Sequence, residues 1–252
     1  MFSFIVRVLL CLAVFSLPSS LHAAETVRVL AALAPPFIIS EQSGYTITLL
    51  QKIEEQTDFT FNITVLPSFT RAWKLTASGQ ADLVLHTALD QETPDFNAQM
   101  IQSSWHLPVQ PAVFYKDPTY FARFLKATDG TEDKDLTVGI PYGNIHYGVQ
   151  NLKLPNSTFQ EAAMDSLVKM LDLGRVDVVW CMKLNVSQAL LRNNIQGVYS
   201  SPYPEGQSIR LGAGFADTKQ GQRLKRKLDK AVDSLDLRRL LPEIYLYSES
   251  PE

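Results

Sequence analysis

Three groups of side chains in this sequence have the types and positions needed to bind a small molecule, and the first is His86 with Thr87. Both follow the apolar run Leu83-Val84-Leu85, which is typical of a strand buried on both faces of a sheet. In open α/β sheets, ligands bind beside the carboxyl ends of the strands. An imidazole and a hydroxyl at such an edge would donate and accept hydrogen bonds.

The other two groups could bind an anion. Asn144, Ile145 and His146 follow Gly143 at a predicted helix start, where free backbone N–H groups bind anionic or carbonyl groups. The alternative is that Asn144 simply caps this helix. Arg71 would reach the cleft as a substitute anion clamp, or else be a solvated charge on a helix surface.

The elements that must position these groups follow from the apolar spacing. Residues 67–80 have apolar side chains near helical spacing, and Gly79 would end that helix. Pro35 and Pro36 end the first strand, because proline lacks the N–H that a sheet needs. The first part of the chain predicts strands at 26–32, 59–66 and 83–85 and helices at 44–57 and 67–79. This βαβαβ order implies a parallel sheet with right-handed crossovers.

A second α/β pattern begins near residue 136. It predicts strands at 136–140, 176–180 and 208–215, a connecting strand at 112–115, and helices at 120–127, from about 147, at 159–173, at 184–191, at 224–235 and at 237–247. The fold class is therefore α/β with two sheets.

Residues 1–23 are predicted to be a cleaved secretory signal peptide. Arg7 gives a positive flank, an apolar run covers 8–17, and small residues at 23 and 24 suit cleavage. The run is shorter than the roughly 20 residues that span a membrane, which disfavours an uncleaved anchor. We therefore expect an exported protein located in the periplasm.

Charge and cysteine content limit the partners and cofactors. Residues 1–23 hold one of the 23 basic residues and none of the 26 acidic ones, so the remainder has a net charge of −4. Because a nucleic-acid partner usually requires a basic surface, none is expected. Cys11 leaves with the signal peptide and Cys181 remains alone, which excludes an internal disulfide. The histidines lack metal-ligand spacing, so neither a metal nor a cofactor is expected.

The order of the elements and several short segments resemble the family 3 periplasmic solute-binding proteins, which bind polar amino acids for ABC transporters. The resemblance covers nearly all of residues 25–247. The segments that carry it are Ala34-Pro35-Pro36-Phe37, Gly44-Tyr45, residues 78–82, Thr93-Pro94-Asp95, residues 136–143 and residues 173–177.

This resemblance implies a type II periplasmic-binding fold, in which two α/β lobes joined by two crossing strands close over a small solute. We predict that lobe 1 comprises residues 24–112 and 214–252 and that lobe 2 comprises residues 113–213. The protein is expected to be a monomer.

Two departures from the family concern the ligand. In its amino-acid binders, an Arg after the Thr-Pro-acid segment grips the ligand carboxylate, but this sequence has Phe96 there. An acid five residues after the position of Asp177 usually receives the ligand ammonium, and here that residue is Met182. A buried zwitterion would then have two unpaired charges, so a standard α-amino acid is not expected as the ligand.

Residue types and the resemblance together give nine candidates for the ligand site. Phe69 falls where the family places a stacking aromatic, although Phe69 and Met182 also suit core positions. The candidates are Phe37, Phe69, Arg71, His86, Thr87, Asn144, Ile145, His146 and Met182.

The sequence favours a secreted solute-binding protein that delivers a small organic ligand to an ABC-type transporter. The first alternative is a sensory module that acts on a membrane partner. An enzyme is not expected, although this fold also serves dehydratases, and His86 and His146 would then form the acid/base pair.

Overall fold

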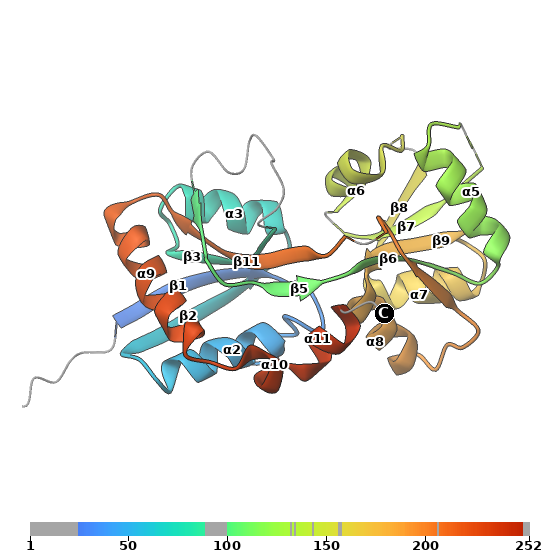
Figure 1. Cartoon of the computed structure of the whole chain (residues 1–252). Coiled ribbons are helices and arrows are strands. Elements are labelled where there is room, and N and C mark those ends of the chain that lie inside the picture. The colour runs from blue at the N-terminus through green and yellow to red at the C-terminus, as the bar shows by residue number, and fades with distance from the viewer. Residues whose placement is uncertain are drawn as a thin grey trace, which may run out of the picture.

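The computed structural model describes residues 25–88, 100–131, 133, 135–142, 144–155, 158–205 and 207–248, without the side chains of Ala88, His146, Tyr147 and Gln150. These residues form two α/β lobes that lie side by side, and Figure 1 shows two extended segments running between them. The predicted fold class is confirmed. The predicted signal peptide and the segment Thr93-Pro94-Asp95-Phe96 lie outside the described residues.

The first lobe is built on a six-stranded sheet with the order β2-β1-β3-β11-β4, in which β5 also pairs with β11. The strands β1, β2 and β3 are parallel, whereas β11 is antiparallel to β3. The strands are β1 (Glu25–Ala32), β2 (Phe59–Leu66), β3 (Leu83–Ala88), β4 (Met100–Gln102), β5 (Leu107–Val109) and β11 (Ile209–Ala216). The helices are α2 (Tyr45–Glu54), α3 (Phe69–Ala77), α9 (Lys219–Asp233), α10 (Leu237–Leu240) and α11 (Pro242–Ser248).

Helices cover both faces of this sheet. On one face, Leu85 lies in a large core together with Leu49 of α2 and Leu228 of α9. On the other face, α3 packs Trp73 against Val84. The consecutive apolar residues of β3 therefore face two different cores, as the apolar run in the sequence predicts.

The second lobe is built on a five-stranded sheet with the order β10-β6-β9-β7-β8. The strands are β6 (Pro111–Tyr115), β7 (Val138–Pro141), β8 (Phe159–Ala162), β9 (Val178–Met182) and β10 (Tyr199–Pro202). The helices are α5 (Pro118–Thr128), α6 (Ile145–Leu152), α7 (Met164–Asp172) and α8 (Lys183–Arg192). Val178 of β9 packs in the core beneath α5 and α6, and Val179 packs in the core beneath α7 and α8.

Within the described ranges, the chain crosses between the lobes at two places. The first crossing passes from β5 to β6 at Gln110, and the second leads from β10 to β11. Lobe 1 is therefore made of two separate parts of the sequence. The predicted lobe boundaries at residues 112 and 213 fall inside β6 and β11.

Two predicted helices are wrong in part. Residues 159–173 were predicted as one helix, but residues 159–162 form β8, which pairs in parallel with β7. Phe159 and Ala162 pack in different cores, as a strand's alternation requires. The predicted helix at 237–247 is divided into α10 and α11 at Leu241, because Pro242 disfavours a helical conformation in the residue before it.

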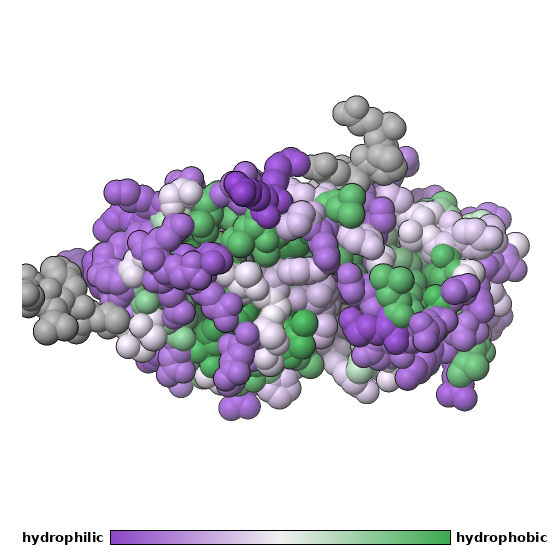
Figure 2. Space-filling model, turned by 90° about the horizontal axis from the view of Figure 1, so that it is seen from below, coloured by the Kyte–Doolittle hydropathy of each residue, from purple (hydrophilic) through white to green (hydrophobic). Residues whose placement is uncertain are grey.

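The surface mixes hydrophilic and hydrophobic residues over both lobes on the face shown in Figure 2. Among the described residues, the large apolar side chains that are exposed are Leu33, Ile39, Tyr142, Leu173, Leu191, Tyr199 and Leu246. None of the helices in the described ranges combines the length and the apolar character that crossing a membrane requires.

Candidate functional site at the facing strand ends

The parallel strands of both lobes end on the sides where the chain crosses between them. In lobe 1, Leu211 lies near the start of β11 and pairs with Ala88 at the carboxyl end of β3. In lobe 2, Pro111 begins β6 and pairs with Met182 at the carboxyl end of β9. Since the other parallel strands run in the same direction, the ligand-binding edges of both sheets turn toward the crossings.

A β-bulge at His86 shapes the edge in lobe 1. Leu85 pairs with Ala213 and Thr87 pairs with Gly212, so His86 is an extra residue on β3 with no partner in β11. Its φ angle of 64° lies in the left-handed region, which is uncommon for any residue other than glycine, although histidine adopts it more often than most. Bulges redirect side chains and often occur beside functional sites.

The redirected imidazole of His86 packs against α2 and the loop that follows β1. Its Nε2 atom lies 2.7 Å from the hydroxyl oxygen of Thr46. The Phe37 ring meets it edge-on, with ring centres 5.4 Å apart at an angle of 82°. Desolvation by these surroundings lowers the pKa of His86 to about 4, so the imidazole is neutral at neutral pH.

The remaining predicted residues of lobe 1 lie in different surroundings. Thr87 is 4% exposed, and its hydroxyl oxygen has no hydrogen-bond partner among the described residues. Phe37 is 1% exposed and therefore belongs to the core. Phe69 is half-buried at the start of α3, next to the small core beneath that helix. Arg71 is exposed on α3, and within the described part of the chain its guanidinium has no ion pair.

The amino terminus of α6 forms the corresponding edge in lobe 2. The backbone N–H of Ile145 donates a 3.2 Å hydrogen bond to a carboxylate oxygen of Glu161, near the end of β8. Asn144 is exposed and makes no capping bond; its amide lies 3.4 Å from the carbonyl oxygens of Pro141 and Tyr142. An acidic side chain of the protein itself therefore occupies part of this predicted anion site.

The side chain of His146 lies outside the described residues. Sequence reasoning did not find Thr46, which contacts His86, or Glu161, which accepts a hydrogen bond from the start of α6. Both contacts join elements that are separated in the sequence.

The start of α8 connects the two lobes beside the crossings. Met182 is half-buried and packs against the lobe 1 core, and Leu184 is a buried member of that core. The Asn185 side-chain amide donates a 2.7 Å hydrogen bond to the carbonyl oxygen of Pro35 in lobe 1. Its amide oxygen is buried without a hydrogen-bond partner among the described residues.

Several solved structures share the two-lobed fold of this protein. The Bordetella pertussis BvgS periplasmic VFT2 domain aligns with a TM-score of 0.62 and 17% identity, over 88% of this chain and 93% of that one. A histidine kinase sensor domain with similarity to periplasmic binding proteins gives a TM-score of 0.64 and 13% identity, over 89% and 95%. The amino acid ABC transporter substrate-binding protein AbpA from Streptococcus pneumoniae, bound to L-arginine, gives 0.62 and 17%, over 89% and 97%.

The fold is that of a type II periplasmic binding protein. No protein-family model matches the sequence, and no curated protein sequence matches it. The second of these structures is a sensor domain and the third is a substrate-binding protein.

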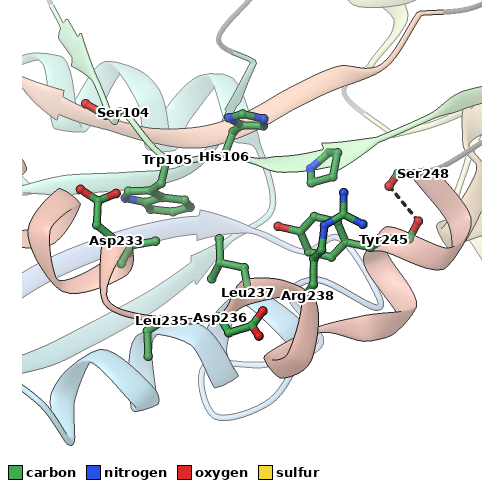
Figure 3. Close-up of a pocket in the computed structure, with 12 residues that line it drawn as sticks. Ser104, Trp105, His106, Asp233, Leu235, Asp236, Leu237, Arg238, Tyr245 and Ser248 are labelled. Carbon is green, nitrogen blue, oxygen red and sulfur yellow. Dashed lines mark hydrogen bonds between the residues drawn. The ribbon is translucent and has the colours of Figure 1, made fainter.

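Two surface cavities on lobe 1 contain none of the nine predicted residues. One has a volume of about 610 Å³ and lies where β5 meets the segment from α9 to α11 (Figure 3). The other, of about 310 Å³, lies beside Arg28 and the start of α9. We place the candidate site of this periplasmic-binding fold at the facing strand ends, because the carboxyl ends of the parallel strands of both sheets lie on the side of the crossings.

Proposed function

We propose that this protein is a solute-binding protein that closes its two lobes on a small organic ligand held between the facing strand ends. The observation that carries the proposal is the orientation of both sheets. Each presents the carboxyl ends of its parallel strands, with buried or half-buried polar groups, to the crossings. A ligand that contacts both lobes only when they are close together would favour the closed state.

The proposed ligand contacts come from both lobes. His86 and Thr87 would provide hydrogen-bonding groups from lobe 1, and the backbone at Ile145 would do so from lobe 2. The full proposed set is Phe37, Phe69, Arg71, His86, Thr87, Asn144, Ile145, His146 and Met182. Phe37 would act through the His86 ring that it supports.

We further propose that the ligand is not a standard α-amino acid. The carboxylate of such a ligand would meet Glu161 at the start of α6, where the Ile145 N–H is already engaged. Two like charges in a partly dehydrated site repel each other, so Glu161 favours a neutral or cationic group at this position. The lack of a charge at Met182 agrees with this proposal.

In this proposal the exported monomer works in the periplasm and delivers its ligand to an ABC-type transporter. The likeness to a transporter substrate-binding protein supports that role. The likeness to a histidine kinase sensor domain supports a second candidate, in which the protein is a sensory module for a membrane partner. A permease and an ATPase encoded beside the gene would favour delivery, whereas co-purification with a membrane kinase would favour sensing.

A thermal-shift screen of the purified protein tests the ligand proposal. The panel would contain α-amino acids, carboxylates, polyamines, sugars and aromatic metabolites. A ligand at about 100 times its dissociation constant should add about 2.7 kcal/mol of stability. Tight binding of an ordinary α-amino acid would contradict the proposed specificity, and a lack of stabilisation by every class would contradict solute binding.

The variant Glu161→Gln tests the role assigned to Glu161. Removing its charge should improve the binding of anionic compounds relative to cationic ones. Asp135→Asn, which neutralises an exposed acid of the same lobe, is the matched control and should leave this preference unchanged. Equal preferences in the two variants would show that Glu161 does not act on the ligand. Turnover of a bound compound that His86→Ala abolishes would instead support an enzyme.

A further inference from the structure

Helix α9 concentrates positive charge in a protein that is acidic as a whole. Its 15 residues include six basic side chains and two acidic ones, which gives the helix a net charge of +4. The whole sequence has a net charge of −3, so the residues outside α9 carry −7. A local concentration of one sign of charge attracts partners of the opposite sign.

Half of these basic side chains are paired within lobe 1. Arg223 and Lys227 form ion pairs with Glu25, the first residue of β1. Lys225 pairs with Asp229, one turn further along the helix. These three cations therefore stabilise α9 itself and its contact with the sheet.

The other three basic side chains are exposed. Lys219, Arg226 and Lys230 form no ion pair with any residue in the described ranges. Their spacing of seven and four residues places them on one side of the helix, over a length of about 17 Å. We call these three residues the basic row. Asp233, at the end of α9, is the one exposed acid of this helix.

The apolar side of α9 is already covered. Leu224, Leu228 and Val232 are buried in the core of lobe 1. The helix therefore has no apolar face to insert into another surface, and a contact through its exposed side is electrostatic. Salt weakens such a contact, because it screens exposed charges.

The location of α9 links the basic row to the first part of the sequence. The helix lies on the outer side of lobe 1, away from lobe 2 (Figure 1). Because two of its cations pair with Glu25, the 24 residues that precede Glu25 are joined to lobe 1 beside this helix. They include the apolar run at 8–17 that predicts a signal peptide, a kind of segment that enters a membrane during export.

We propose that the basic row docks lobe 1 on a membrane surface that contains anionic phospholipids. The lipid phosphate groups pair with Lys219, Arg226 and Lys230, and a flat surface reaches all three because they form one row. The docked protein leaves the crossings free, because α9 lies on the outer side of its lobe. This inference does not rest on the site proposed at the facing strand ends, and the two share no residue.

Vesicle flotation tests this proposal. The protein is purified after export, in its processed form, so that the apolar run at 8–17 does not itself bind lipid. One set of vesicles contains phosphatidylcholine alone, and the other contains equal amounts of phosphatidylcholine and phosphatidylglycerol. The protein should float with the anionic vesicles at about 0.05 M salt, should stay behind with the neutral ones, and should be released at about 0.5 M salt.

Two variants with the same net charge separate the basic row from the charge of the whole protein. The first variant neutralises the basic row and carries Lys219→Gln, Arg226→Gln and Lys230→Gln. The control variant neutralises three exposed cations of lobe 2 and carries Lys126→Gln, Lys169→Gln and Arg175→Gln. Each charge near an anionic surface contributes about fivefold to binding, so the first variant should bind about 100-fold more weakly at low salt. The control variant should keep most of the binding.

Three results would overturn the proposal: equal binding to the neutral and anionic vesicles, an equal loss in the two variants, or no binding to the anionic vesicles at low salt. The last of these is also the result expected if the basic row serves an acidic protein instead. Glutamine suits an exposed helical position, and circular dichroism would show that both variants are folded. The thermal-shift screen reports separately on ligand binding at the strand ends, so either proposal can fail without the other.

Discussion

The imidazole of His86 should make the stability of this protein depend on pH. Desolvation lowers the pKa of His86 to about 4, whereas the ordinary value, expected in the unfolded chain, is 6.5. Between these values the unfolded state binds more protons than the folded state, so stability falls as the pH falls. Above about pH 6.5 the imidazole is mostly neutral in both states and adds little pH dependence.

The size of this effect follows from the two pKa values. The linkage relation gives a loss of about 2 kcal/mol between pH 7 and pH 5, and about 3 kcal/mol by pH 4. These are upper values, because His86 keeps part of its surface accessible to water. A folded domain is typically stable by only about 5–15 kcal/mol, so the loss would be easy to measure.

The matched variant is His86→Asn, which removes the titrating ring. Asparagine tolerates the left-handed backbone at this position, where φ is 64°. Urea unfolding at about pH 7, 6 and 5 should show that the unmodified protein loses more stability than the variant does, by up to about 2 kcal/mol. All other titrating groups are common to both proteins. If both lose the same free energy over this range, the desolvation assigned to His86 is wrong.

Three further predictions concern packing and reactivity. Gly44→Ala should lower the free energy of unfolding by about 3 kcal/mol, because φ is 125° and a Cβ would lie 2.3 Å from the carbonyl oxygen of Phe37. Gly79→Ala, where φ is 77° and the Cβ would meet open space, should cost only about 1 kcal/mol. Equal losses of the two variants in urea unfolding would contradict the clash assigned to Gly44. Burial raises the pKa of Cys181 to about 12, although the residue is half-buried by accessible surface. At pH 8 a thiol reagent should therefore react more slowly with the folded protein than with the unfolded one, by up to roughly 1,000-fold, and equal labelling rates would contradict this. Asn185→Ala should cost about 1 kcal/mol in urea unfolding, through loss of the 2.7 Å bond to Pro35, and an unchanged midpoint would mean that this link between the lobes adds no stability.

Local patterns predicted the elements whose burial is decided within a short segment. The alternating residues 59–66 form β2 with the predicted bounds, and the continuous apolar run of β3 is buried on both faces. Helix α3 begins after Ser68, whose hydroxyl accepts a hydrogen bond from the third residue that follows it, and Gly79 lies just beyond its end. In each case the neighbouring residues contain the required information.

The parts that sequence reasoning missed depend on pairing between distant segments. Residues 159–162 have an apolar spacing that also suits a helix, and only their pairing with β7 makes them a strand. Glu161 reaches the start of α6 because that pairing brings β8 beside it. The contact of Asn185 with Pro35 joins residues of different lobes, so no local signal could predict it. The bulge that redirects His86 likewise depends on the register between β3 and β11.

The position of β11 in the lobe 1 sheet has a consequence for how the chain assembles during synthesis. This strand lies between β3 and β4, and among the described strands β4 and β5 pair only with β11. Lobe 2 lies within one continuous stretch, from β6 to β10, and its sheet can form before β11 has been made. Lobe 1, which contains β1, is therefore the last to be completed, with its edge strands β4 and β5 unpaired until residues 209–216 emerge from the ribosome.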